Sequence, residues 1–104
     1  MGKNKDIHKL TNLMTKALRH KIGSIVNKDE FYANKYVKDA EVIMKEAEKV
    51  LLRQNWNDHD KGKIREQLRI KLRKELEQKD FLHNGKFEIM NEEIDKALKK
   101  FGLF

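Results

Sequence analysis

Proline and cysteine are both absent from this sequence of 104 residues, and each absence narrows the kind of protein that it can encode. A chain without cysteine has no disulfide framework and no thiolate metal site. A chain without proline lacks the residue that breaks helices from within, and a charged fraction of 39% favours solvated helices over strands. The five glycines are scattered, so there is no glycine-rich phosphate loop. The length predicts a single helical domain, residues 1–104, with a modest core.

Long apolar runs are missing as well. The longest ones, such as Val50-Leu51-Leu52, are far too short to span a bilayer, and no secretory hydrophobic region follows the start. We therefore expect a soluble, cytoplasmic protein with no membrane partner. The four histidines form no i,i+3 or i,i+4 pair, so no zinc site is indicated. Nothing in the sequence suggests a cofactor or a small-molecule ligand.

Positive charge is in excess, with a net value of +7 that is unevenly spread. Residues 1–26 carry six Lys/Arg against one acidic residue, and residues 58–79 carry eight against five. Residues 27–57 are balanced, with six of each sign, and residues 80–104 carry four against five. Such asymmetry indicates a polyanionic partner, or else lysines that only solvate helix faces.

The spacing of apolar residues predicts helices over most of the chain. The first covers about residues 5–21 and ends at Gly23-Ser24, where glycine supplies a left-handed cap. The second covers about residues 27–54, with an asparagine cap at its first position and one continuous apolar face. An interruption of this helix near its N-terminal end, at Asn34 or Asp39, is an alternative.

Two further helices are predicted in the second half of the chain. The third begins at Asp58 or Asp60, because an acidic cap suits the positive end of a helix dipole, and it ends near Lys79. The fourth is capped by Asn91 and ends in a Schellman turn at Gly102-Leu103.

Segment 81–89 separates these two helices and contains Asn84-Gly85 between short apolar runs. Asn-Gly in this setting predicts a hairpin-like turn, although strands this short are marginal alone, so a turn packed on the helices is the alternative. The fold class is therefore all-α, a compact bundle of about four helices.

Two stripes at i,i+4 spacing run side by side along the third predicted helix, one apolar and one basic. The apolar stripe, which would join the core, is Ile64, Leu68, Leu72 and Leu76. The basic stripe, which would face phosphates or an acidic protein surface, is Lys61, Arg65, Arg69 and Arg73, with Lys71 and Lys74 nearby. Lys16 and Arg19 of the first helix complete the candidate contact residues.

A few residues permit catalytic interpretations. Arg53 and His59, separated by five residues, are similar to the Arg-x(4–6)-His signature of HEPN ribonucleases. That resemblance implies metal-independent RNA cleavage, in which the arginine steadies phosphate and the histidine handles the proton. His59-Asp60 also spells the dyad of helical metal-dependent phosphohydrolases, which would further need residues such as His20 and Asp95. A role as a helix cap, in which the carboxylate accepts from the backbone, accounts for Asp60 equally well.

Trp56, the only tryptophan, stands in the polar interruption before the third helix. It closes the end of a small core, offers a platform for stacking a base, or forms a hot spot for a protein partner, and the core role is the one favoured.

Two blocks of the chain resemble the C-terminal helical region of type I restriction enzyme R subunits, the motor and endonuclease subunits of these enzymes. The first block is residues 16–22, KALRHKI, followed after a gap by Phe31-Tyr32. The second is Asn55-Trp56 followed by residues 64–72, IREQLRIKL. Together they lie within residues 10–76.

The resemblance implies an accessory role. In that family the region helps to dock the motor to the methyltransferase core and lies near the DNA path, while catalysis resides elsewhere. Arg65 and Arg69 match the arginines of the family. This chain departs from the family after residue 79, where a fourth helix replaces the usual tail, and it contains no helicase or nuclease motif.

We therefore expect a non-catalytic helical assembly domain of a type I restriction-modification motor subunit. Its partners would be protein subunits and the phosphates of double-stranded DNA. The alternatives are the small HEPN-like ribonuclease that uses Arg53 and His59, and a free-standing regulator that binds a protein.

Overall fold

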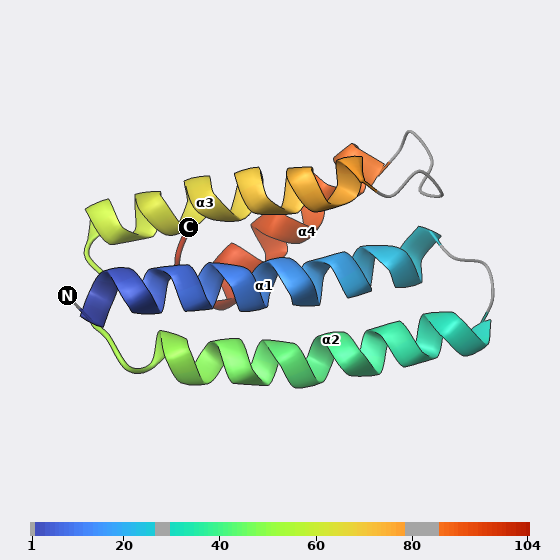
Figure 1. The fold of residues 1–104 in the computed structure, drawn as a ribbon, viewed down its shortest axis with the longest axis horizontal. Helices are drawn as coiled ribbons and strands as arrows, with labels where there is room; N and C mark the ends of the chain where they lie inside the picture. The colour runs from blue at the N-terminus through green and yellow to red at the C-terminus, as the bar shows by residue number, and fades with distance from the viewer. Residues whose placement is uncertain (1, 27–29, 79–85) are drawn as a thin grey trace.

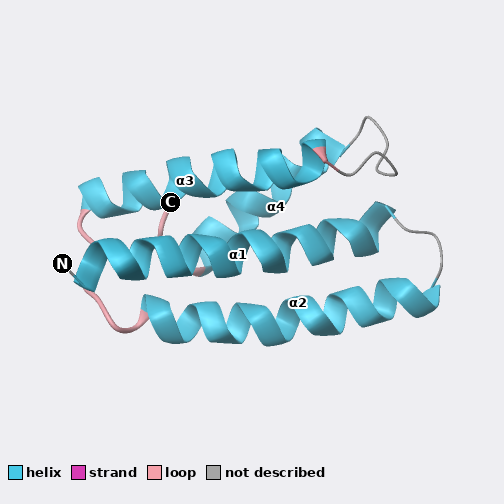
Figure 2. Ribbon diagram, viewed as in Figure 1, coloured by secondary structure: helices cyan, strands magenta, loops and turns pink. Residues whose placement is uncertain are grey.

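The computed structural model describes residues 2–26, 30–78 and 86–104, and within these ranges every regular element is an α-helix. Figure 2 shows the helices and the short connections between them. The helices are α1 (Gly2–Val26), α2 (Glu30–Leu51), α3 (Asp58–Glu77) and α4 (Lys86–Lys100). The predicted all-α bundle is thus confirmed.

Successive helices run in opposite directions, so α1 and α3 are parallel and α2 and α4 are antiparallel to them (Figure 1). Helix α1 lies between α2 and α3 and packs against all three other helices. Helix α4 packs on α1 and α3, whereas α2 packs on α1 alone among the described helices. This unequal packing leaves α2 and α4 apart.

The predicted apolar stripe of α3 lies at the centre of the core. Ile64, Leu68, Leu72 and Leu76 are all 0% exposed. Each side chain of this size contributes about 1.5–3 kcal/mol when it leaves water, so the stripe fixes which face of α3 is inward. The other helices contribute the fully buried residues Leu10, Met14, Leu18 and Ile22 of α1, and Ile94 and Leu98 of α4.

The prediction that α1 ends at Gly23-Ser24 is wrong, because the helix continues to Val26. Gly23 is buried, and a Cβ at this position would lie 3.4 Å from Cδ2 of Tyr36 on α2. The ring of Tyr36 also packs on His20, with 5.8 Å between the ring centroids. A Cβ at this distance would make an ordinary van der Waals contact, so Gly23 lies inside a continuous helix under the Tyr36 ring and does not cap it.

Helix α2 is continuous from Glu30 to Leu51, so the break considered at Asn34 or Asp39 does not occur. The predicted cap at residue 27 lies outside the described residues. Three residues beyond the end of α2, the side-chain amide of Gln54 donates to Asp6 Oδ2 at 2.8 Å.

Helix α3 begins at Asp58, as predicted, but its cap is Asn57 and not Asp58 or Asp60. The Asn57 side chain accepts a hydrogen bond from the backbone N–H of Asp60 at 2.8 Å. The Asp60 carboxylate in turn accepts from the backbone N–H of Asn57 at 3.1 Å. Asp60 is therefore the reciprocal partner in a capping box.

Helix α4 begins at Lys86, so Asn91 lies inside the helix and is not its cap. The reason is an apolar stripe that starts a turn earlier than predicted, with Met90 buried and Phe87 packed against the core. Residues 86–89 of the predicted hairpin-like turn are accordingly helical, and residues 81–85 lie outside the described part of the chain.

The predicted Schellman turn after α4 is confirmed. Gly102 has a φ of 67°, which is the left-handed conformation that glycine adopts without strain. The N–H of Leu103 donates to the carbonyl of Leu98 at 2.8 Å, and that of Gly102 donates to Lys99 at 3.2 Å. Leu103 is 1% exposed and closes this end of the core.

Candidate polyanion-binding groove

The basic stripe of α3 is largely engaged within the molecule. Arg65 donates from Nη1 to the backbone carbonyl of Leu103 at 2.8 Å, and thereby holds the C-terminal turn against α3. Arg69 Nη2 lies 3.5 Å from Asp95 Oδ1 of α4, in an ion pair that is about half exposed. Both arginines thus stabilise the packing of the C-terminal helix.

Arg73 also faces α4. Its guanidinium lies 5.2 Å from the centroid of the Phe87 ring, and its Nε lies 3.3 Å from Glu77 Oε1. Lys61, the remaining member of the stripe, is half-buried in the first turn of α3. The side of α3 that carries these cations is therefore mainly the α3–α4 contact surface.

The other two candidate residues, Lys16 and Arg19, line a groove of about 460 Å³ between α1 and α3. Helix α3 contributes Lys71 and Lys74 to the opposite wall. The remaining lining residues are Asn12, Thr15, Glu75 and Gln78, and none belongs to α2 or α4. The parallel packing of α1 and α3 therefore brings together basic residues that are more than 50 positions apart in the chain.

Two contacts fix the register of α1 and α3 at this groove. Arg19 Nη1 lies 3.3 Å from Glu75 Oε2, and Lys71 Nζ donates to Thr11 Oγ1 at 2.7 Å. Burial lowers the pKa of Lys71 from its usual value, because the surrounding protein replaces part of the water that would solvate the ammonium. Among the described residues that line the groove, Glu75 is the only acidic one, and Arg19 neutralises it.

Exposed lysines extend both rims of the groove. On α1, Lys9 and Lys5 precede Lys16 by 7 and 11 residues, which places all three on one side of the helix. On α3, Lys63 precedes Lys74 by 11 residues, which is also about three helical turns. None of these five lysines has an ion-pair partner among the described residues. We call this surface the basic face: Lys5, Lys9, Lys16, Arg19, Lys63, Lys71 and Lys74.

The candidate ribonuclease pair has a different setting. Arg53 follows α2 and lies 3.9 Å from Asp6, with Nη1 nearest to Oδ1. His59 is exposed in the first turn of α3. No hydrogen bond or ion pair joins Arg53 to His59, although both residues lie in the described part of the chain.

Asp60, the second residue of the His-Asp dyad, has structural partners. Lys3 Nζ lies 2.6 Å from its Oδ2, which also accepts from the backbone of Asn57. The hydrogen bond from Lys3, helped by the one from Asn57, lowers the pKa of Asp60 from its usual value although burial opposes the shift. Within residues 2–26, 30–78 and 86–104, no group of three or more His, Asp or Glu could hold a metal ion.

Trp56 has the core role that was favoured for it. Its indole Nε1 donates to the carbonyl of Leu51 at 2.8 Å, and its half-buried ring packs against the core. The tryptophan thus closes the connection between α2 and α3.

No protein-family model matches this chain, and neither a curated protein nor a solved structure matches it significantly. Each described helix is too short or too polar to cross a lipid bilayer. The function proposed below therefore rests on the charge and geometry of the basic face.

Proposed function

We propose that the protein is a non-catalytic helical interaction domain that binds the phosphate backbone of double-stranded DNA through its basic face. The observation that carries this proposal is the α1–α3 groove, which has cations on both walls and, among the residues that the structure describes, a single acidic lining residue that Arg19 already neutralises. Two rows of ammonium groups on parallel helices attract a polyanion and displace its condensed counterions.

The chemistry of the groove favours contact with phosphates over contact with bases. None of its described lining residues is aromatic, so this part of the surface offers no platform on which unpaired bases could stack. Lysine ammonium groups act as point charges and carry no fixed bidentate geometry for a base edge. We therefore expect affinity that depends steeply on salt and little on sequence.

The resemblance of residues 10–76 to the C-terminal helical region of type I restriction motor subunits supports the same role. On this proposal the domain would contribute DNA contact and subunit docking within a larger enzyme. Cleavage and translocation would reside in other domains.

The proposal is tested by fluorescence anisotropy with a labelled DNA duplex of about two helical turns, titrated with salt. The variant Lys9→Glu/Lys16→Glu/Lys74→Glu reverses three exposed charges of the basic face. We expect it to lose duplex binding at moderate salt. At low salt we expect the slope of log K against log salt to fall by about three.

A matched control is Lys35→Glu/Lys38→Glu/Lys49→Glu, which makes the same change in net charge on exposed positions of α2. Far-UV circular dichroism of both variants checks that helicity is retained. If the two variants lose affinity equally, the binding follows overall charge and the proposed surface is wrong. If the wild type binds no duplex at low salt, the whole proposal is wrong.

A further inference from the structure

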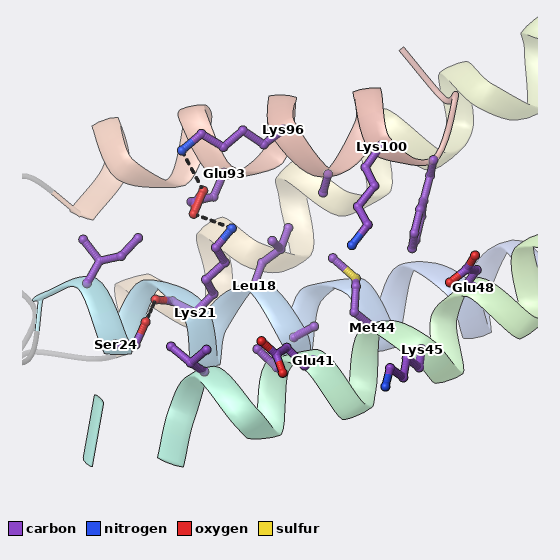
Figure 3. A pocket seen from close by; sticks show the side chains of 16 residues that line it. Leu18, Lys21, Ser24, Glu41, Met44, Lys45, Glu48, Glu93, Lys96 and Lys100 are labelled. Carbon is purple, nitrogen blue, oxygen red and sulfur yellow. Dashed lines mark hydrogen bonds and ion pairs between the residues drawn. The ribbon is translucent and has the colours of Figure 1, made fainter. Parts of the chain in front are cut away.

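A second groove, of about 630 Å³, lies between α2 and α4 (Figure 3). The backbones of these two helices do not approach each other in the described part of the chain, and each helix packs against α1. The C-terminal half of α1 therefore forms the floor of the groove, and α2 and α4 form its walls. None of its residues lines the α1–α3 groove.

The interior of this groove is apolar and built in part from small side chains. Ala17 and Leu18 form the floor, Ala40 and Met44 belong to the α2 wall, and Ala97 belongs to the α4 wall. Alanine on all three sides lets the backbone of an incoming helix approach closely. Val37 and Ile25 at one end are 39% and 50% exposed, so apolar surface is left uncovered there.

The groove has the length of a short helix. On α2 it extends from Val37 to Glu48, and on α4 from Glu93 to Lys100, with Phe101 just beyond the helix. At about 1.5 Å per residue these walls are roughly 16 and 10 Å long, which corresponds to about two to three turns of an α-helix. Amphipathic helices recognise grooves of this kind through apolar residues at i, i+3 or i+4, and i+7.

The two walls carry opposite charges near their rims. Figure 3 shows Glu41 and Glu48 along α2, and Lys96 and Lys100 along α4. Lys45 is the one basic residue that α2 contributes to the lining. An occupant that matches these walls carries acidic side chains toward α4 and basic side chains toward α2.

Glu93 marks the polar end of the groove. Its side chain is only 2% exposed, and Lys21 Nζ lies 3.0 Å from Oε1. Lys96 Nζ lies 3.6 Å from Oε2, which is too far for a hydrogen bond, and no other described residue donates to this oxygen. Because Oε2 is itself buried, the carboxylate is held within the protein between these two lysines and is not a contact for an occupant.

We propose that the groove between α2 and α4 binds an amphipathic helix of a partner protein. That helix presents about two to three turns of small apolar residues to α1, acidic residues to Lys96 and Lys100, and basic residues to Glu41 and Glu48. This surface acts independently of the basic face, so either proposal can fail without the other.

The test uses three fluorescent synthetic peptides of about five turns that share one Leu/Ala stripe and differ only in their flanks. The first has Glu on one flank and Lys on the other, the second has Glu on both, and the third has Lys on both. We expect the wild-type protein to bind the Glu/Lys peptide about fivefold more tightly than the Glu/Glu peptide and about tenfold more tightly than the Lys/Lys peptide. The positive net charge of the protein alone would favour the Glu/Glu peptide, so the expected order distinguishes recognition by the two walls from attraction by overall charge.

The variant Glu41→Lys/Glu48→Lys makes both walls basic and should switch the preference to the Glu/Glu peptide. Its matched control, Glu46→Lys/Glu66→Lys, changes two exposed acids that do not line the groove and should keep the wild-type order. The proposal is overturned if no peptide binds, if all three bind alike, or if both double variants shift the preference equally.

Discussion

The basic side chains of α3 have two roles: some pack within the protein, and others are exposed on the basic face. Arg65 donates to the carbonyl of Leu103, so its charge is part of the packing of the C-terminal turn. Lys63 and Lys74 are exposed and face away from these contacts. Neighbouring residues on a helix differ by about 100° in direction, so a shift of one or two positions decides which helix a cation meets. The residue type alone does not show whether a basic side chain on α3 packs within the protein, as Arg65 does, or stays exposed to a ligand, as Lys63 and Lys74 do.

His20 gives a prediction at the same scale. Burial, followed by the positive charge of Arg19, lowers the pKa of His20 from 6.5, with Asp39 opposing the shift. The unfolded chain therefore takes up a proton before the folded one as the pH falls. Stability that depends on neutral His20 is present above about pH 6.5 and is lost as the pH drops below that value.

We expect the thermal midpoint of the wild type to fall between about pH 7.5 and about pH 5.5, and this fall to be smaller in His20→Gln. The exposed His59 provides the control, because His59→Gln should retain the wild-type fall. A midpoint that depends on pH equally in the wild type and in His20→Gln would show that the histidine does not titrate against folding.

At the scale of helices, two glycines illustrate what local pattern can and cannot reveal. Gly102 follows the last basic turn of α4 and precedes an apolar residue, and this pattern alone predicts its Schellman turn. Gly23 looks like another helix end, but the ring of Tyr36 from α2 covers it and α1 continues. The difference comes from a tertiary contact that sequence spacing does not contain.

The two glycines should respond in opposite directions to alanine. Gly23→Ala should raise the free energy of unfolding by about 0.5–1 kcal/mol, because the helix interior gains a better helix former and the new Cβ meets Tyr36 at van der Waals distance. Gly102→Ala should lower it by about 1–2 kcal/mol, because alanine is strained at positive φ. Urea unfolding of both variants measures the two effects. Destabilisation by Gly23→Ala would contradict a continuous α1.

At the scale of the whole molecule, the sequence predicts the fold better than the surface. The stripe from Ile64 to Leu76 identifies the inner face of α3 because apolar spacing is a local property. The basic face could not be predicted in the same way. Lys16 and Lys74 meet at one groove only because α1 and α3 pack in parallel and in register, which follows from the whole bundle.

The bundle also explains how one small domain could hold two partners. One side of helix α1 carries basic residues and lines the α1–α3 groove. Another side carries Ala17 and Leu18 and forms the floor of the α2–α4 groove. Nucleic acid and a protein helix could therefore bind together without competing for the same side chains. That arrangement suits the role in assembly that we propose.

The most direct test of the central claim is a titration of the isotope-labelled protein with a DNA duplex, followed by ¹H–¹⁵N nuclear magnetic resonance. The account predicts that the amides of the basic face, around Lys9, Lys16, Lys63 and Lys74, shift progressively while those of α2 and α4 stay in place. Shifts that concentrate on α4 and the arginine side of α3 would contradict it, as would a spectrum that the duplex leaves unchanged at low salt.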